Sequence, residues 1–540
     1  MRHFIFVLAA ALISAEAMAA SIVIGPIIRD VGPDRVVIGF QTDVPVAASI
    51  EIGTTDAYGT VIASSSGTTW HSVQVTGLLA KSMRHYRVLL NGVPSGRAGT
   101  FVTAPAAPEP FTFLLYGDTR SNPEAHALVV SRMLEHPAAF AINTGDLVEN
   151  GSSTAMWTQF TSTVSSLVGD MALLAVVGNH DLDGDGPPDS FLQYAGPPTS
   201  AADPKTYGIF DYAGVRLILL DRFYAAVIDS NCYAMTGSFE YCMNSTQRAW
   251  LLAQLGAARD DPTVRHVLIV VHEGPYSSKP GRIGSTEMRL LLNDMARSKV
   301  RMILSGHDHY YEHGIAGNGL HYVVSGGGGA PLYETEPSEG PDVPPHKVLM
   351  STSTYNFQRV IVNGDSFEIT SYQADGTEME SFEVTVPPAC SLPADCAAPA
   401  SGSCEGKAEC SNELRCVWAC TPPPQCADAS ECEIRTPDES CSGAWACLDT
   451  NCVWECNTPP DPGPGDLGTN DVSTVVDVPQ TDLGSLADTG PVTPPDPAPA
   501  GGGGGGCASG QNTAPPLGFL APLLLIVSFV LRFRGRARRS

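Results

Sequence analysis

The chain has 540 residues, of which 43% are hydrophobic and 16% are charged, and its formal net charge is -26 at pH 7. Such an acidic chain repels polyanions, so the composition argues against a nucleic-acid-binding protein and favours small soluble substrates. The length is sufficient for two globular domains and several small modules.

Residues 1–19 have the pattern of a secretory signal peptide. An early arginine is followed by an apolar run over residues 4–13 and by small residues at positions 17 and 19. This pattern predicts cleavage after Ala19 and an exported mature chain, located at the cell surface or outer membrane or released from the cell.

Residues 20–108 show short runs of alternating polarity, at 36–42, 47–52, 71–75 and 86–90, separated by Gly, Asp and Pro turns. Such a pattern predicts a small all-β sandwich, in which Tyr86 is a candidate corner tyrosine. The segment contains no cluster of catalytic residue types, so we expect it to pack beside a catalytic domain.

Residues 109–388 alternate between apolar runs and helical patterns. The apolar runs lie at 111–116, 140–142, 173–177, 267–271 and 302–304, and the helical patterns at 124–135, 245–259 and 285–298. This alternation predicts α/β layering, and sheets of this kind bind ligands at one edge, beyond the carboxyl ends of the strands.

Polar clusters follow these predicted strands. They are Gly117-Asp118, Gly145-Asp146, Gly178-Asn179-His180-Asp181, His272 and Gly306-His307-Asp308-His309. Carboxylates, imidazoles and one amide form a mixed oxygen and nitrogen set that suits zinc, manganese or iron better than calcium. A bridging carboxylate can hold two ions roughly 3.5–4 Å apart, a spacing used for in-line displacement at phosphorus, and Asp146 is the candidate bridge.

The order and spacing of these clusters resemble the calcineurin-like metallophosphoesterases over residues 109–386. Within that family, GHDHYYE at 306–312 and HEGPYSS at 272–278 look most like purple acid phosphatases. The resemblance implies an αββα sandwich that holds two divalent or trivalent ions of iron, zinc or manganese. It also implies that residues 20–108 are similar to the fibronectin type III-like domain preceding the catalytic domain in purple acid phosphatases.

Residue by residue, the resemblance implies two ligand sets and a proton donor. Asp118, Asp146 and His309 would hold the first ion, and Asp146, Asn179, His272 and His307 the second. His180 would protonate the leaving oxygen, and Asp181 would orient and charge His180.

Arg120 is the main departure from the family pattern. It stands where members with a full first site carry a histidine, and Glu149 stands where purple acid phosphatases carry a tyrosine. Glu149 or water could complete the first site. Arg120 either pairs with phosphate oxygens of the substrate or is an ordinary surface arginine.

The predicted function is hydrolysis of small phosphomonoesters by metal-activated hydroxide. One alternative is a phosphodiesterase or nucleotidase on the same fold. A second is a non-catalytic surface binding protein with a degenerate dimetal site, which Arg120 and the modular C-terminal part suggest.

Residues 389–456 contain twelve cysteines in two similar blocks of six, and each block includes a Cys-Val-Trp segment. In an exported chain, such repeats predict small disulfide-rich modules. We also expect a disulfide between Cys232 and Cys242 within the catalytic domain.

Residues 457–506 are rich in Pro, Asp, Thr and Gly and predict a disordered stalk. Residues 507–540 combine Cys507, a hydrophobic stretch at 517–531 and an arginine-rich end, and they resemble the sorting tags of myxobacterial surface proteins. We expect membrane attachment through this segment or through a lipidated Cys507; a simple C-terminal anchor is the alternative.

Overall fold

The computed structural model describes residues 20–386 except 65, 184–187, 198–204, 225, 228–231, 233–234, 237–239 and 338–345, together with 396, 406–410, 416–420, 443–448 and 451–456. The predicted signal peptide, stalk and C-terminal membrane segment lie outside these residues. Within the described part of the chain, no helix is both long and apolar enough to span a membrane.

The N-terminal region consists of two antiparallel sheets packed face to face. Strands with alternating polarity bury one face each, as Val36, Ile38 and Phe40 do. One sheet has the order β1 (Ile22–Val31), β2 (Arg35–Val46), β5 (Thr68–Thr76), and the other has the order β4 (Thr60–Ala63), β3 (Ala48–Gly53), β6 (Met83–Leu90), β7 (Val93–Val102).

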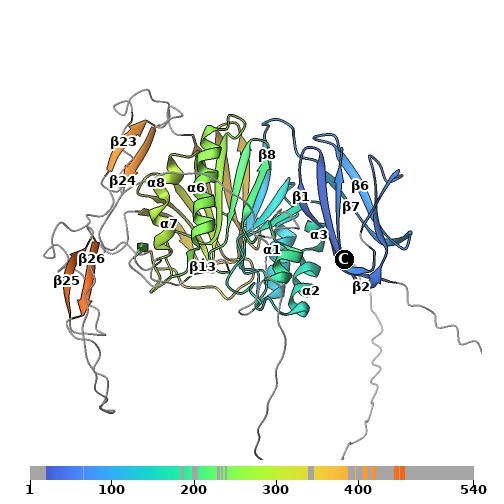
Figure 1. Cartoon of the computed structure of the whole chain (residues 1–540), viewed down its shortest axis with the longest axis horizontal. Helices are drawn as coiled ribbons and strands as arrows, with labels where there is room; N and C mark the ends of the chain where they lie inside the picture. Colours follow the sequence, from blue (N-terminus) through green and yellow to red (C-terminus); the bar gives the residue numbers. More distant parts are fainter. Residues whose placement is uncertain are drawn as a thin grey trace, which may run out of the picture. The chain divides into compact units, whose positions relative to one another are not determined.

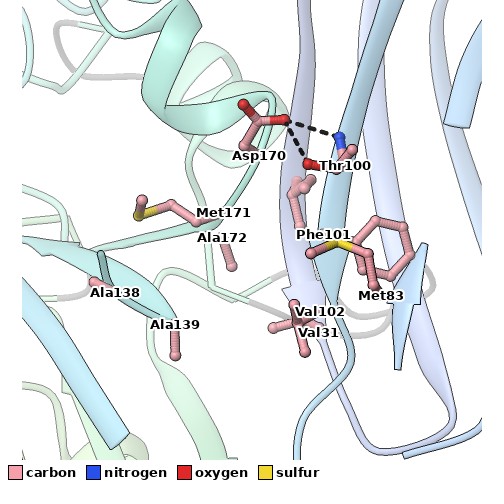
Figure 2. A pocket seen from close by; sticks show the side chains of 11 residues that line it. Val31, Met83, Thr100, Phe101, Val102, Ala138, Ala139, Asp170, Met171 and Ala172 are labelled. Carbon is pink, nitrogen blue, oxygen red and sulfur yellow. Dashed lines mark hydrogen bonds between the residues drawn. The ribbon is translucent and has the colours of Figure 1, made fainter. Parts of the chain in front are cut away.

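Tyr86 connects this sandwich to the catalytic domain. Its ring is fully buried, and its hydroxyl donates to the carbonyl of Gly169, at 2.8 Å. A corner tyrosine bonds within its own domain, so that expectation is wrong. Figure 2 shows the adjoining contact, in which Asp170 accepts from the backbone and side chain of Thr100 beside a small pocket of 130 Å³.

Two mixed sheets form the centre of the catalytic domain. The six-stranded sheet has the order β10 (Ala172–Ala175), β9 (Phe140–Asn143), β8 (Phe111–Tyr116), β20 (Asn356–Asn363), β21 (Ser366–Gln373), β22 (Glu378–Thr385). The seven-stranded sheet has the order β11 (Gly208–Tyr212), β12 (Val215–Leu220), β15 (His266–Glu273), β16 (Val300–Gly306), β18 (His321–Ser325), β17 (Tyr311–Ala316), β19 (His346–Thr352).

Both sheets are covered on both faces, which explains their continuous apolar runs. In β8, Phe113 and Leu115 pack into the core between the sheets, whereas Leu114 and Tyr116 pack against helices. The helices on this side are α1 (Pro123–Met133), α2 (Thr154–Thr163), α3 (Ser165–Val168) and α4 (Asp189–Tyr194). Those on the seven-stranded sheet are α6 (Ser245–Asp260), α7 (Thr286–Leu290) and α8 (Leu292–Ala296). The domain is therefore the expected αββα sandwich (Figure 1).

The helix expected over residues 285–298 is divided into α7 and α8. The amide of Leu291 donates to Met288, three residues back, instead of four as in a continuous α-helix. The strands β8, β9 and β10 run parallel, as do β12, β15, β16 and β18. The segments that follow β8, β9, β10 and β16 carry the polar clusters, and His272 lies near the end of β15.

The cysteine-rich repeats contribute matching hairpins. β23 (Gly406–Cys410) pairs with β24 (Cys416–Cys420), and β25 (Gly443–Leu448) pairs with β26 (Asn451–Cys456). Cys396 is bonded to Cys416, and the expected bridge between Cys232 and Cys242 is present. The first hairpin contacts α8 through the ion pair of Arg297 and Glu409. A short two-stranded sheet, β13 (Ala226–Val227) with β14 (Cys242–Met243), adjoins the Cys232–Cys242 bridge.

Replacing Tyr86 with Phe is expected to lower the free energy of unfolding by about 1 kcal/mol, because the part-buried hydrogen bond to the carbonyl of Gly169 is lost. Urea denaturation measures the change. The control is Tyr224→Phe, since Tyr224 is 40% exposed. Equal effects of the two substitutions would contradict a specific role for the Tyr86 hydroxyl.

Candidate metal centre

Backbone of unusual conformation presents three of the polar side chains. Asp118, Asp146 and His307 have φ values of 54°, 55° and 68°, in the left-handed region that side chains other than glycine seldom adopt. Neighbouring glycines permit the close approach, because a Cβ at Gly178 or Gly306 would collide with the carboxylate of Asp146 or Asp118. Folding therefore places side chains here at the cost of local strain.

Asp118, Asp146 and His309 form the first group of ligand types. All three are buried, and their ligand atoms lie within 4.8 Å of one another. Nδ1 of His309 lies 2.7 Å from the carbonyl oxygen of Pro331 and donates its proton to that oxygen. Nε2 then has a free lone pair, and it lies 3.5 Å from Oδ1 of Asp118. A carbonyl partner of this kind fixes the tautomer of a metal-binding histidine.

Asp146 also belongs to a second group with His272 and His307. Asn179, which the resemblance adds to this group, directly precedes His180, whose amide donates to Asp146 Oδ1 at 2.9 Å. Nε2 of His272 lies 3.4 Å from Asp146 Oδ1 and 3.3 Å from Nδ1 of His307. Nδ1 of His272 lies 2.7 Å from the carbonyl of Thr144, which fixes that ring in the same way.

Two buried oxygens in this cluster have no hydrogen-bond partner among the described residues. They are Oδ1 of Asn179 and Oδ1 of Asp118. A buried polar atom without a hydrogen-bond partner lowers the stability of the fold, and a cation bound at each of these oxygens would remove that cost. The residues are therefore consistent with two ions: the first group would hold one, the second group would hold the other, and Asp146 is common to both groups.

The electrostatics of the cluster agree with a cation site. Burial raises the pKa of Asp118 well above its usual value. Burial would also raise that of Asp146, but the charge and hydrogen bond of His272 lower it instead. Burial alone would lower the pKa of His272, yet the two carboxylates raise it to about 9. A proton on His272 thus supplies positive charge that a metal ion would replace.

His180 and Asp181 point in different directions. His180 is partly exposed, and its Nδ1 lies 3.0 Å from the carbonyl of Glu149. The fully buried carboxylate of Asp181 accepts instead from four backbone amides, at Gly178, Asp146, Leu147 and Val148. The expectation that Asp181 orients His180 is therefore wrong: Asp181 turns inward because those amides need an acceptor, and it fixes the loop that carries Asp146.

Arg120 lies within the centre, and 11% of its side chain is exposed. Its Nε donates to Asp146 at 3.1 Å, one terminal nitrogen lies 2.7 Å from Glu149, and the other lies 3.3 Å from Nε2 of His309. The carboxylate of Glu149 faces this guanidinium. Arg120 therefore contacts two side chains of the first group and is not an ordinary surface residue.

Sequence reasoning missed three further residues near His309, namely Lys279, Arg282 and Tyr333. Tyr333 stacks on His309, Lys279 lies over Tyr333, and Arg282 pairs with Asp308. The segment Lys279-Pro280-Gly281-Arg282 is a recognisable turn sequence, but its place beside the centre depends on tertiary structure.

This fold and donor set define a metal-dependent phosphoesterase domain. Residues 111–311 match the family model of the calcineurin-like phosphoesterases, so this part of the chain is a calcineurin-like metallophosphoesterase domain.

Solved structures support the fold. Purple acid phosphatase PPD1 from yellow lupin (Lupinus luteus) seeds has a TM-score of 0.55 and a sequence identity of 16% to this chain. The superposition covers 68% of this chain and 74% of the lupin chain. The structure of PhoD has a TM-score of 0.50 at 12% identity, covering 67% of this chain and 92% of its own.

Two curated proteins of Mycobacterium tuberculosis, both described as uncharacterized, are each 25% identical over 315 residues. The match covers 52% of this chain and 57% of either relative.

Metal binding at the second set is expected to release about one proton at pH 7, because His272, whose pKa is raised to about 9, must be deprotonated to bind. Below pH 9 the proton competes with the ion, so affinity falls about tenfold for each unit of decreasing pH. Calorimetric titration with Mn²⁺ in buffers of different ionisation enthalpy measures the proton count. Binding without proton release would contradict this assignment.

Proposed function

We propose that the chain is an exported, surface-attached phosphoesterase that hydrolyses phosphomonoesters with two ions of iron, zinc or manganese. The observation that carries the proposal is a buried cluster of five ligand-type side chains, together with the buried amide oxygen of Asn179, which has no hydrogen-bond partner among the described residues. The five side chains are Asp118, Asp146, His272, His307 and His309.

The bound ions would polarise the phosphate and lower the pKa of the attacking water. Arg120 presents a planar fork of donors, suited to phosphate oxygens. In the imidazolium form of His180, Nδ1–H donates to the carbonyl of Glu149, and Nε2–H can give its proton to the leaving oxygen as the P–O ester bond breaks. The new P–O bond comes from water, so no covalent phosphoenzyme is expected.

A pocket of 460 Å³ opens beside Arg120 and supports an organic leaving group of moderate size. Its lining combines apolar side chains, such as Met156 and Phe160, with polar ones, such as Ser121 and Gln159. Phosphomonoesters of small organic alcohols are the substrates that we infer.

Export is supported by the signal-like pattern of residues 1–19 and by two disulfides, Cys232–Cys242 and Cys396–Cys416. Disulfides persist in oxidising compartments. Attachment to the surface rests on the pattern of residues 507–540.

The full chain tests the proposal directly. Its metal content is measured by mass spectrometry, and the same sample is assayed with mononitrophenyl and bis-nitrophenyl phosphate. Two ions per chain with faster turnover of the monoester are expected. Faster turnover of the diester would instead support a phosphodiesterase.

A non-catalytic binding protein is the second candidate, and the contacts of Arg120 favour it. The guanidinium bonds to Asp146 and His309, two groups that the first ion requires. One ion or none per chain, without turnover after added manganese, zinc or iron, would support this candidate.

Replacing His180 with Ala is expected to reduce turnover by about 10²–10⁴-fold, the usual contribution of a proton donor, and to leave metal content unchanged. Steady-state assays and mass spectrometry measure the two quantities. His85→Ala is the control, because His85 belongs to β6 of the N-terminal sandwich. Unchanged turnover in the His180 variant would remove its role as proton donor.

A further inference from the structure

A four-residue turn carries two cations beside the metal centre. Residues 279–282 read Lys-Pro-Gly-Arg, the amide of Arg282 donates to the carbonyl of Lys279 at 3.0 Å, and Gly281 has a φ of 77°. Proline followed by a glycine of positive φ is the signature of a type II turn. The turn follows β15, the strand that carries His272.

Tyr333 connects Lys279 to the first ligand group. The ring of Tyr333 stacks on His309 with centroids 4.0 Å apart, and the ammonium of Lys279 lies 3.5 Å from the Tyr333 ring centroid. His309 and Lys279 therefore both contact the Tyr333 ring. Because these contacts already occupy the ring, a ligand is more readily bound by the Lys279 ammonium than by stacking on Tyr333. A cation–π contact leaves the N–H donors of the ammonium able to bind an anion.

Arg282 is held by a single ion pair. One terminal nitrogen lies 2.6 Å from Oδ1 of Asp308, the buried residue between His307 and His309. A guanidinium has five N–H donors, so this pair leaves donors for a ligand.

Lys279 has no carboxylate within ion-pair distance among the residues that the structure describes. Burial lowers its pKa, and the charges of Arg282 and Arg120 lower it further, while Asp308 acts in the opposite direction. The chain carries a net charge of -26, yet Lys279 is close enough to two other cations, Arg282 and Arg120, for their charges to act on it. Repulsion among them would be relieved by an anionic ligand.

We propose that Lys279 and Arg282 form a second anion-binding subsite, beside the metal centre, for a phosphate or carboxylate carried elsewhere on the substrate. The subsite deepens the proposed function and rests on it for the position of the scissile phosphate. Substrates with two anionic groups would then be bound at both ends, and simple monoesters at one end only.

The test measures binding to the metal-loaded full chain by calorimetry, using three phosphonates that cannot be hydrolysed. Propylphosphonate has one anionic group, whereas a propane bisphosphonate adds a second phosphonate and phosphonobutyrate adds a carboxylate. The wild type is expected to bind at least one of the two doubly anionic ligands about tenfold tighter than propylphosphonate. If the bisphosphonate binds more tightly, the subsite accepts a phosphate; if phosphonobutyrate binds more tightly, the subsite accepts a carboxylate.

Lys279→Gln is expected to abolish this preference and to leave the affinity for propylphosphonate and the metal content unchanged. Lys279→Arg should retain it, and the control Lys347→Gln, on β19, should not alter it. Equal affinity of the wild type for all three ligands, or an equal loss for all three in Lys279→Gln, would overturn the subsite. A retained preference without turnover of nitrophenyl phosphate would reject the proposed function and not the subsite.

Discussion

Two carboxylates buried side by side, Asp118 and Asp146, impose the constraint on which the rest of the centre depends. Their negative charge has little access to water, so nearby groups must neutralise it. His272 does so by holding a proton, and Arg120 by donating to Asp146. Metal ions neutralise such a pair more effectively, because one carboxylate can bridge two of them.

The scaffold maintains this arrangement through contacts that take no part in the chemistry. Asp181 accepts from four amides around the loop of Asp146, and backbone carbonyls fix the rings of His272 and His309. Positive φ values at Asp118 and Asp146 are tolerated because these contacts over-determine the loops. Precision in the centre therefore comes from buried backbone hydrogen bonds as much as from the ligand side chains.

Charge is distributed unevenly in this molecule. The whole chain is strongly acidic, whereas three cations, Arg120, Lys279 and Arg282, lie beside the metal centre. An acidic chain repels polyanions and local cations attract small anions, so the combination supports the proposal of small anionic substrates. The N-terminal sandwich contacts the catalytic domain through Tyr86, and the first cysteine-rich hairpin contacts it through the ion pair of Glu409 with Arg297.

The sequence by itself determined the layers and the ligand types, because apolar runs ending in polar clusters are local patterns. It predicted the αββα sandwich, and it predicted six ligand-type residues, of which Asp118, Asp146, His272, His307 and His309 lie in one cluster. Tertiary structure decided the rest. No local pattern specifies the orientation of the residues in three such contacts. These are the hydrogen bonds of the buried Asp181 carboxylate, the hydrogen bond from Tyr86 to Gly169 and the cation–π contact of Lys279 with Tyr333. Side-chain direction and partner choice depend on what the remainder of the fold leaves unsatisfied.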